Sequence, residues 1–585
     1  MNFQPNRLAA MVAVTLALSV GQAMAAPAPA PSDNATVNLI RLLVKQGVLT
    51  QAQSDTLVRQ AEAEAQQVRQ AQAQRTAAAP AAAGGAVAGA AAGAAAGPDV
   101  QPGDVRVPYV PEIVRDQIRD EVKGEVMAQA KQENWASPNT FPDWVSRLKF
   151  SGDVRARDES HFFSDGNSNQ VVDYNGLNRN GPYDVNSNTS HSLPPILNTR
   201  ENRENRFRIR ARLGVLATLP DDWSAGIRVA TGSDDGPVST SQTLGDDFEK
   251  KSIWLDQAWV RWKSPYHTDF TFGRAENPFM HTDLLFSDDL QMDGISAKVP
   301  NLKLTENTSL FGTLGAFPLE YGSDSWPSNS QDKGKSEDKW LFGGQLGSEW
   351  KLNDTNTLKG AVAYYRFDNI AGRRSSSCNL YQGEPACDTD WSQPEFMQKG
   401  NTVFLLRNIA LDPNDPQDTP LPQYVGLASE FDLLDLNLQW DTETFNSMKL
   451  RLQGNYVRNL AYDEDKMNRR SDGQIVNNLD DDGHIQSGPN AWMVQTTYGR
   501  SLEMQDAGDW NVFAGYKYIQ PDAMPDGFND STFHLGGTNA KGYYIGANYA
   551  INKLISVEGR WLSADEVYGD PLSINVFQLD LNAHF

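Results

Sequence analysis

Beyond its extreme N-terminus, the sequence contains no long run of strongly apolar residues. A membrane-spanning helix needs about 20 predominantly apolar residues, and the mean hydropathy of the whole chain is only −0.52. Spanning helices are therefore excluded. The chain is also poor in basic residues relative to acidic ones, with a net charge of −23 over 585 residues. Nucleic-acid-binding proteins carry basic surfaces, so we expect no nucleic-acid partner.

Histidine and cysteine are scarce as well. The chain has 7 histidines, and neither a G-x-S-x-G nor an H-E-x-x-H motif occurs. We therefore expect no enzyme, no catalytic residues and no cofactor. The two cysteines, Cys378 and Cys387, lie in a loop-like stretch without a neighbouring histidine, which argues against a metal site. In an oxidising compartment they predict a disulfide, which would stabilise the protein by about 2–3 kcal/mol at most.

The N-terminus itself indicates export. Arg7 precedes an apolar stretch from Leu8 to Val20, and Ala23-Met24-Ala25 follows. A charged start, a short apolar core and a small-x-small ending predict a signal peptide over residues 1–25. We expect the rest of the chain to lie outside the cytoplasm.

Three segments separate the signal peptide from the pattern that fills most of the chain. The composition of residues 26–76 predicts a helical segment, for which a coiled coil is one option. Residues 77–110 are rich in Ala, Gly and Pro and predict a linker. Residues 111–143 predict a second helix and a lead-in, with an apolar residue at every fourth position. This helix either packs on its own domain or joins subunits and periplasmic partners. Its apolar stripe consists of Val114, Ile118, Val122 and Val126.

From Trp144 to the end, apolar and polar residues alternate in short segments. In LKFSGDVRAR, Leu148, Phe150 and Val154 share one face, while the polar residues between them share the other. A period of two is typical of β-strands and not of helices. The same alternation recurs in RFRIRARLGV, MKLRLQGNYV and FQLDLNAHF.

Short and long connections take turns between about sixteen such strands. Strands of about ten residues, with short turns at one end and long polar loops at the other, are typical of outer-membrane barrels. The sequence therefore predicts an all-β transmembrane barrel over residues 144–585, with about sixteen antiparallel strands and an N-terminal helical periplasmic extension. The last strand ends in Phe585, which resembles the signal read by the barrel-assembly machinery.

Several segments in a fixed order carry a family resemblance. LLVKQGVLTQAQ, VPYVPEIVRDQIRDEVK, WVSRLKFSGDVRAR, RFRIRARLGV, LDQAWVRWK and FGRAENPF resemble the putative porin family of Gram-negative bacteria. The resemblance covers most of the chain and is best over residues 105–300. It implies a sixteen-stranded outer-membrane porin that passes small hydrophilic solutes, and it implies no particular substrate.

Arginines occupy alternate positions of one predicted strand. An arginine that faces hydrocarbon at mid-membrane costs about 2–4 kcal/mol, so we expect these side chains to face the pore. A basic lining favours anions, which predicts a diffusion channel with mild anion preference. The alternative is that the arginines hold an acidic loop folded into the channel. The expected pore-lining residues are Arg155, Arg157, Arg206, Arg208, Arg210, Arg212, Arg228, Lys449 and Arg451.

The acidic loop is expected between Gly273 and Gly294, after the fifth strand, where general porins fold a constriction loop into the channel. Its candidate residues are Arg274, Glu276, Asp283, Asp288 and Asp289.

Two other functional classes compete with a porin: a barrel tethered through its N-terminal helices to periplasmic partners or peptidoglycan, and a barrel enzyme. The expected partners are outer-membrane lipid, lipopolysaccharide, the barrel-assembly machinery and small solutes. A homotrimer would suit a barrel of this size.

Overall fold

The computed structural model describes residues 143–585, apart from 234–235, 328–329 and 332. The expected signal peptide, the segments 26–76 and 77–110, and nearly all of 111–143 lie outside the described residues. Among the described residues, no helix has both the length and the apolar character needed to cross a membrane.

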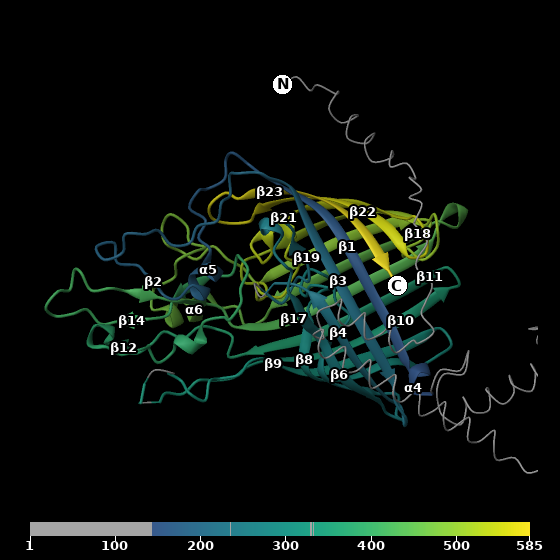
Figure 1. The fold of residues 1–585 in the computed structure, drawn as a ribbon, viewed down its shortest axis with the longest axis horizontal. Helices are drawn as coiled ribbons and strands as arrows, with labels where there is room; N and C mark the ends of the chain where they lie inside the picture. Colours follow the sequence, from purple (N-terminus) through teal and green to yellow (C-terminus); the bar gives the residue numbers. More distant parts are fainter. Residues whose placement is uncertain (1–142, 234–235, 328–329, 332) are drawn as a thin grey trace, which may run out of the picture. The chain divides into compact units, whose positions relative to one another are not determined.

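Sixteen long antiparallel strands of the described residues close into one barrel (Figure 1). The last strand pairs with the first, so neither leaves an open edge. The expected barrel of about sixteen strands is confirmed. The strands are β1 (Leu148–Phe163), β3 (Arg203–Thr218), β4 (Trp223–Thr231), β6 (Ile253–Lys263), β7 (Asp269–Glu276), β8 (Gln291–Lys303), β9 (Thr308–Glu320), β10 (Lys339–Asn353), β11 (Asn356–Asp368), β17 (Phe431–Glu443), β18 (Lys449–Asn459), β19 (Asn490–Gly499), β20 (Trp510–Ile519), β21 (Ala540–Ala550), β22 (Ile555–Glu566) and β23 (Ser573–His584).

The remaining elements are short and lie in the connections or at the start of the described chain. The helices are α4 (Asp143–Ser146), α5 (Tyr174–Arg179) and α6 (Glu464–Ser471). The short strands are β2 (Tyr183–Asp184), β5 (Gln242–Thr243), β12 (Ser377–Cys378), β13 (Val403–Leu405), β14 (Asn408–Ile409), β15 (Pro422–Gln423) and β16 (Val425–Leu427). The 3-10 turns are η1 (Asp246–Phe248), η2 (Leu380–Gln382), η3 (Asp390–Ser392), η4 (Phe445–Ser447) and η5 (Phe533–Leu535). Strand pairing thus begins at Leu148, after α4.

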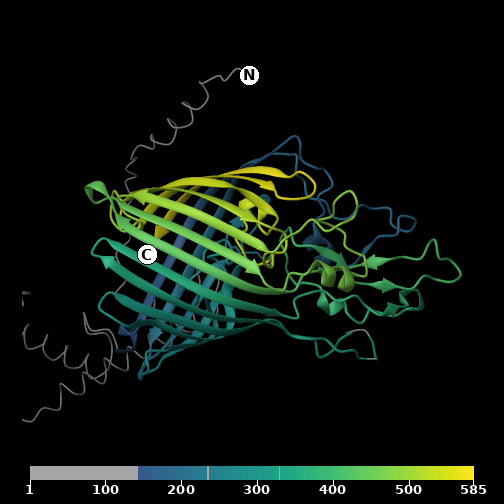
Figure 2. The same cartoon turned by 180° about the vertical axis from the view of Figure 1, so that it is seen from behind.

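Short turns and long loops occupy opposite ends of the barrel (Figure 2). The turns comprise residues 219–222, 264–268, 304–307, 354–355, 444–448, 500–509 and 551–554. The loops comprise residues 164–202, 232–252, 277–290, 321–338, 369–430, 460–489, 520–539 and 567–572. This asymmetry is the one that the sequence predicts, except that the turn 500–509 has ten residues and the loop 567–572 only six.

The two faces of the strands differ as the alternation predicts. On β3, Phe207 and Leu213 are 59% and 48% exposed on the outer face, whereas Arg208 and Arg210 make ion pairs inside the barrel. A water-soluble monomer rarely exposes so continuous an apolar surface. The outer face therefore suits lipid, and the inner face carries the polar groups.

The alternation changes phase at one point, where Gly273 of β7 lies opposite Gly294 of β8. Both glycines have positive φ, 109° and 135°, and a Cβ on either one would lie 2.3 Å from a backbone oxygen of the neighbouring strand. Before this point Thr271 bonds with Arg261 inside the barrel, and after it Glu276 contacts Arg228. The inward positions of β7 thus change from odd to even numbers.

The C-terminal residue completes the closure of the barrel. The backbone amide of Gly152 donates to the Phe585 carbonyl at 2.8 Å, and the Phe585 amide donates to the Gly152 carbonyl at 3.0 Å. The Phe585 ring covers Gly152, because a Cβ there would lie 2.6 Å from a ring carbon. The glycine leaves the space in which the terminal phenylalanine lies against the first strand.

We expect Gly152→Val to impair closure, because the new side chain displaces the Phe585 ring at a cost of about 1–3 kcal/mol. The folded fraction, measured by heat-modifiable mobility after refolding in detergent, should fall. Gly454→Val is the matched control, since the atom nearest to its Cβ lies 4.0 Å away. Equal folded fractions for the two variants would contradict this account.

Candidate pore and inner loop

The connection between β7 and β8, residues 277–290, folds into the barrel and is called the inner loop below. Leu284, Leu285 and Phe286 on it are at most 1% exposed. The Phe286 ring meets the inward-facing Tyr365 ring edge-on at 5.3 Å, and Phe279 meets the same ring at 5.0 Å. This apolar packing fixes the middle of the loop inside the barrel.

Hydrogen bonds tie the inner loop to strands far from its own. The amide of Met280 donates to the Gln345 side chain on β10 at 2.7 Å. Thr282 Oγ1 donates to Asn455 on β18 at 2.6 Å. Asp283 accepts from Lys517 Nζ on β20 at 2.8 Å. Since β20 lies eight strands beyond β7 in the sixteen-stranded barrel, the loop crosses the interior.

Seven arginines on three adjacent strands form the opposite attachment and are called the arginine ladder below. They come from β1, β3 and β4, and their side chains face the interior, where most of them meet carboxylates. The members are Arg155, Arg157, Arg206, Arg208, Arg210, Arg212 and Arg228. Their carboxylate partners are Asp153, Glu159, Asp256, Glu276, Asp289 and Asp580.

One carboxylate of the inner loop, Asp289, lies directly on the ladder. Its Oδ1 is 3.5 Å from Arg210 and 3.4 Å from Arg212, and its Oδ2 accepts from the amide and hydroxyl of Thr240 at 3.1 and 3.0 Å. The same two arginines share Asp153 on β1. Asp289 thus fastens the inner loop to β3 and to the 232–252 loop.

Two members of the ladder are less neutralised than the others. Among the described residues, Arg206 donates only to a hydroxyl, that of Thr243 at 3.3 Å. Arg155 donates to Ser241 at 2.5 Å and lies 3.9 Å from Asp580, whose oxygens are already held by Arg157 at 2.6 and 2.7 Å. The surplus positive charge of the ladder therefore lies on these two side chains.

The other predicted pore residues are dispersed. Lys449 pairs with Glu443 at 2.6 Å, and Arg451 pairs with Asp441 at 2.7 Å, both near the short-turn end. The expectation that Arg274 and Glu276 belong to the loop is corrected, because pairing with β8 keeps both on β7. Asp288 remains on the inner loop with its side chain 90% exposed.

The long loops pack on one another at the mouth of the barrel. Cys378 and Cys387 form a disulfide within the 369–430 loop. Asp522, which is fully buried in the 520–539 loop, accepts from Thr402 and Ser487 at 2.6 Å each. The loops 369–430, 460–489 and 520–539 thereby form one layer.

Asp526 in this layer is 1% exposed and incompletely satisfied. Its Oδ1 accepts from the Gln398 amide at 3.3 Å, and its Oδ2 has no partner. Burial raises the pKa of Asp526 to about 7, with the charge of Asp522 acting in the same direction and that of Lys399 against it. The layer therefore contains a carboxyl group that titrates near neutral pH.

Of the carboxylates that neutralise the ladder, Glu276 and Asp289 were predicted from the sequence, whereas Asp153, Glu159, Asp256 and Asp580 were not. Asp153 shares the inward face of β1 with Arg155, and Asp580 occupies an inward position of the last strand. The alternation showed that both residues occupy polar positions. Which arginine each one faces, however, depends on how β1 pairs with β23 when the barrel closes. Lys517, which anchors Asp283, likewise becomes evident only when the inner loop is seen to reach β20.

Comparison with known proteins gives one family and several barrels. A family model described as "Putative porin" matches residues 33–585. No curated protein matches the chain. Among solved structures, Pseudomonas putida OprB is 10% identical, with 75% of this chain and 95% of that chain covered and a TM-score of 0.39. The Acinetobacter baumannii outer membrane channel DcaP is 10% identical, with 75% and 97% covered and a TM-score of 0.35. Salmonella typhi OmpF in complex with daunomycin is 9% identical, with 75% and 97% covered and a TM-score of 0.33.

We expect Asp289→Asn to loosen the inner loop, because hydrogen bonds from two arginines to a charged oxygen are weakened, at a cost of about 2 kcal/mol. In planar bilayers the variant should show a noisier current with frequent excursions to higher conductance. Asp288→Asn is the control, because the 90% exposed Asp288 side chain lies beside His281 of the same loop, at 3.7 Å, and not on the arginine ladder. A quiet wild-type-like current from Asp289→Asn would refute the fastening role.

We expect the packing of the 520–539 loop to depend on pH through Asp526. Its pKa in the folded protein, about 7, exceeds that of an unfolded aspartate, about 3.9. The free energy of unfolding is therefore greatest at a pH below the unfolded pKa. It declines as the pH rises from that pKa toward the folded pKa. Hydrogen-exchange protection factors in this loop, which are corrected for the intrinsic rise of the exchange rate with pH, should be lower at pH 8 than at pH 5, and Asp526→Asn should remove most of this difference in protection. The control Asp570→Asn should keep the full difference in protection between the two pH values. If Asp526→Asn keeps it as well, Asp526 is not the group responsible.

Proposed function

The chain belongs to the putative porin family, and from this premise we propose that it is an outer-membrane porin for passive diffusion of small hydrophilic solutes, with mild anion preference. The long loops would then face the cell exterior and the short turns the periplasm. The proposal includes no catalysis. Its partners are membrane lipid, lipopolysaccharide and the barrel-assembly machinery, and a homotrimer is part of the proposal.

The observation that carries this function is the contrast between the two faces of the barrel. The outer face is apolar, whereas the inner face carries the arginine ladder and its carboxylates, and polar linings belong to water-filled passages. A barrel that served only as a tether would need no such interior. The N-terminal helices that would form a tether lie outside the described part of the chain. We therefore propose no second function.

The anion preference is proposed to be mild because the ladder is largely neutralised. Seven arginines face six carboxylates, and the surplus lies on Arg155 and Arg206. A unit charge about 8 Å from a passing ion in water contributes about 0.5 kcal/mol. One such charge therefore changes relative permeability by about twofold, whereas an unpaired ladder would exclude cations strongly.

We expect the double variant Arg155→Gln/Arg206→Gln to lower the chloride-to-potassium permeability ratio by about fourfold, because each of the two removed charges contributes about twofold by the same Coulomb estimate. The measurement is the reversal potential in a potassium chloride gradient. Neither side chain contacts the inner loop directly, so conductance should change little. Arg458→Gln is the control, since Arg458 lies on the outer-facing phase of β18, which it shares with the exposed Leu452. A reversal potential identical to that of the wild type would reject the selectivity role.

A further inference from the structure

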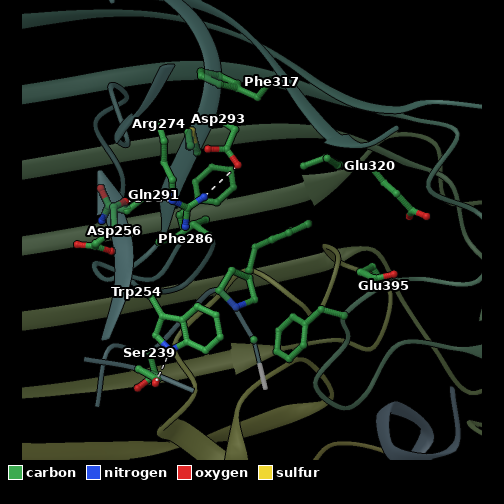
Figure 3. Close-up of a pocket in the computed structure, with 18 of the residues that line it drawn as sticks. Ser239, Trp254, Asp256, Arg274, Phe286, Gln291, Asp293, Phe317, Glu320 and Glu395 are labelled. Carbon is green, nitrogen blue, oxygen red and sulfur yellow. Dashed lines mark hydrogen bonds and ion pairs between the residues drawn. The ribbon is translucent and has the colours of Figure 1, made fainter. Parts of the chain in front are cut away.

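A cavity of about 640 Å³ lies at the mouth of the barrel and is called the vestibule below. It is bounded by the long-loop ends of strands β4 and β6–β10, by Phe286 of the inner loop, and by residues 394–396 of the 369–430 loop. Figure 3 shows Trp254, Phe286 and Arg274 on one side of the open space, and Glu320 and Glu395 on the other. Its volume is in the range of cavities that hold small organic ligands.

Much of the vestibule wall is aromatic. Trp254 is 46% exposed, and its indole nitrogen donates to the Gly232 carbonyl at 2.7 Å, which fixes the ring at the wall. Phe286, Phe317 and Phe396 also line the space. A passage for ions alone has no need of such a surface, whereas a solute with an apolar body would bury area against it.

The cationic side chains of the vestibule already have partners. Arg274 donates to Asp293 at 3.0 Å and to the Asp256 carbonyl at 3.0 Å. Lys339 is 3% exposed and donates to Glu320 at 2.6 Å and to the Gln393 carbonyl at 2.5 Å. Arg179 at the rim is also engaged in an interaction. An incoming anion would have to compete with these contacts.

The carboxylates are more available. Glu395 is exposed and has no ion-pair or hydrogen-bond partner among the described residues. The Asp293 side chain is 53% exposed and that of Glu320 is 32% exposed, so each can accept further hydrogen bonds besides its existing one. The accessible polar groups of the vestibule therefore favour a positive charge.

We propose that the vestibule binds amphipathic organic cations, meaning solutes with an aromatic or aliphatic body and an ammonium group. The body lies against Trp254 and Phe396, and the ammonium group is held by Glu395, with Glu320 on the same side of the open space. An indole face also attracts a cation directly. This inference rests on the proposed porin function and adds a binding step for one class of solute. The mild anion preference arises elsewhere, on β1 and β3.

The experiment is current block in planar bilayers with the full chain. The probe is 2-phenylethylammonium, compared with 2-phenylethanol, 3-phenylpropanoate and ethylammonium, each added on the long-loop side. We expect only 2-phenylethylammonium to interrupt the current with resolvable dwell times. Glu395→Gln should shorten the dwell time about threefold, the scale of one exposed ion pair. Trp254→Leu should shorten it by a similar factor, the scale of one aromatic contact between the phenyl ring and the indole.

Glu384→Gln is the matched control, because it removes a carboxylate of the same loop that does not line the vestibule. Its dwell times should equal those of the wild type. Block by 3-phenylpropanoate instead of the ammonium probe, or equal block by ethylammonium, would overturn the proposal, as would an unchanged dwell time in both vestibule variants. An open channel that no probe blocks would refute binding in the vestibule but not the porin function. The absence of any conductance in potassium chloride would refute the porin function itself.

Discussion

The structure depends on one constraint: hydrocarbon cannot accept or donate hydrogen bonds, so every backbone group of a spanning strand must pair within the protein. A sheet meets this condition only by closing, which is why β23 returns to β1 and why the last residue bonds to Gly152. Closure also separates the side chains, since alternate residues then face either lipid or the interior. The apolar stripe of Phe207 and Leu213 and the ladder of arginines are two results of this single geometry.

Charged side chains inside the barrel in turn determine where the inner loop lies. Guanidinium groups crowded on neighbouring strands repel one another unless carboxylates lie between them, and Asp153 on β1 supplies only part of what is needed. Asp289 supplies more from the inner loop, while Lys517 on the opposite wall holds Asp283. The loop is thus fastened by opposite charges at two ends, with Phe279 and Phe286 packed on Tyr365 between them. The same arginines hold the loop and contribute to the field inside the barrel, so the proposed anion preference depends on where the loop lies.

Much of this architecture could be predicted from the sequence because the alternation reports directly on the two solvents that a strand touches. The strand number, the asymmetric loops, the inward arginines and the location of the inner loop follow from local patterns. The neutralising carboxylates on the strands could not be predicted in this way. The residue that faces Arg157 is Asp580, 423 positions away, and this pairing depends on the register between the first and last strands. The phase change at Gly273 was hidden for a different reason: a positive φ is a property of the backbone, and the sequence shows only a glycine there. The long loops pack through contacts that follow no regular spacing in the sequence. No pattern therefore indicated that Asp522 and Asp526 would be buried.

The strongly acidic composition of the chain is compatible with a basic wall because distance and water separate the two. Charges in exposed loops are screened beyond about 8 Å at physiological ionic strength, so acids such as those at 480–482 act little on an ion deep in the barrel. Charges on the arginine ladder act at short range, but most of these arginines are paired with carboxylates at 2.6–3.5 Å. The net charge of −23 is therefore a poor guide to selectivity, and so is a count of inward arginines. What an ion experiences is the small difference between the ladder and its partners, and the register of strand closure determines that difference.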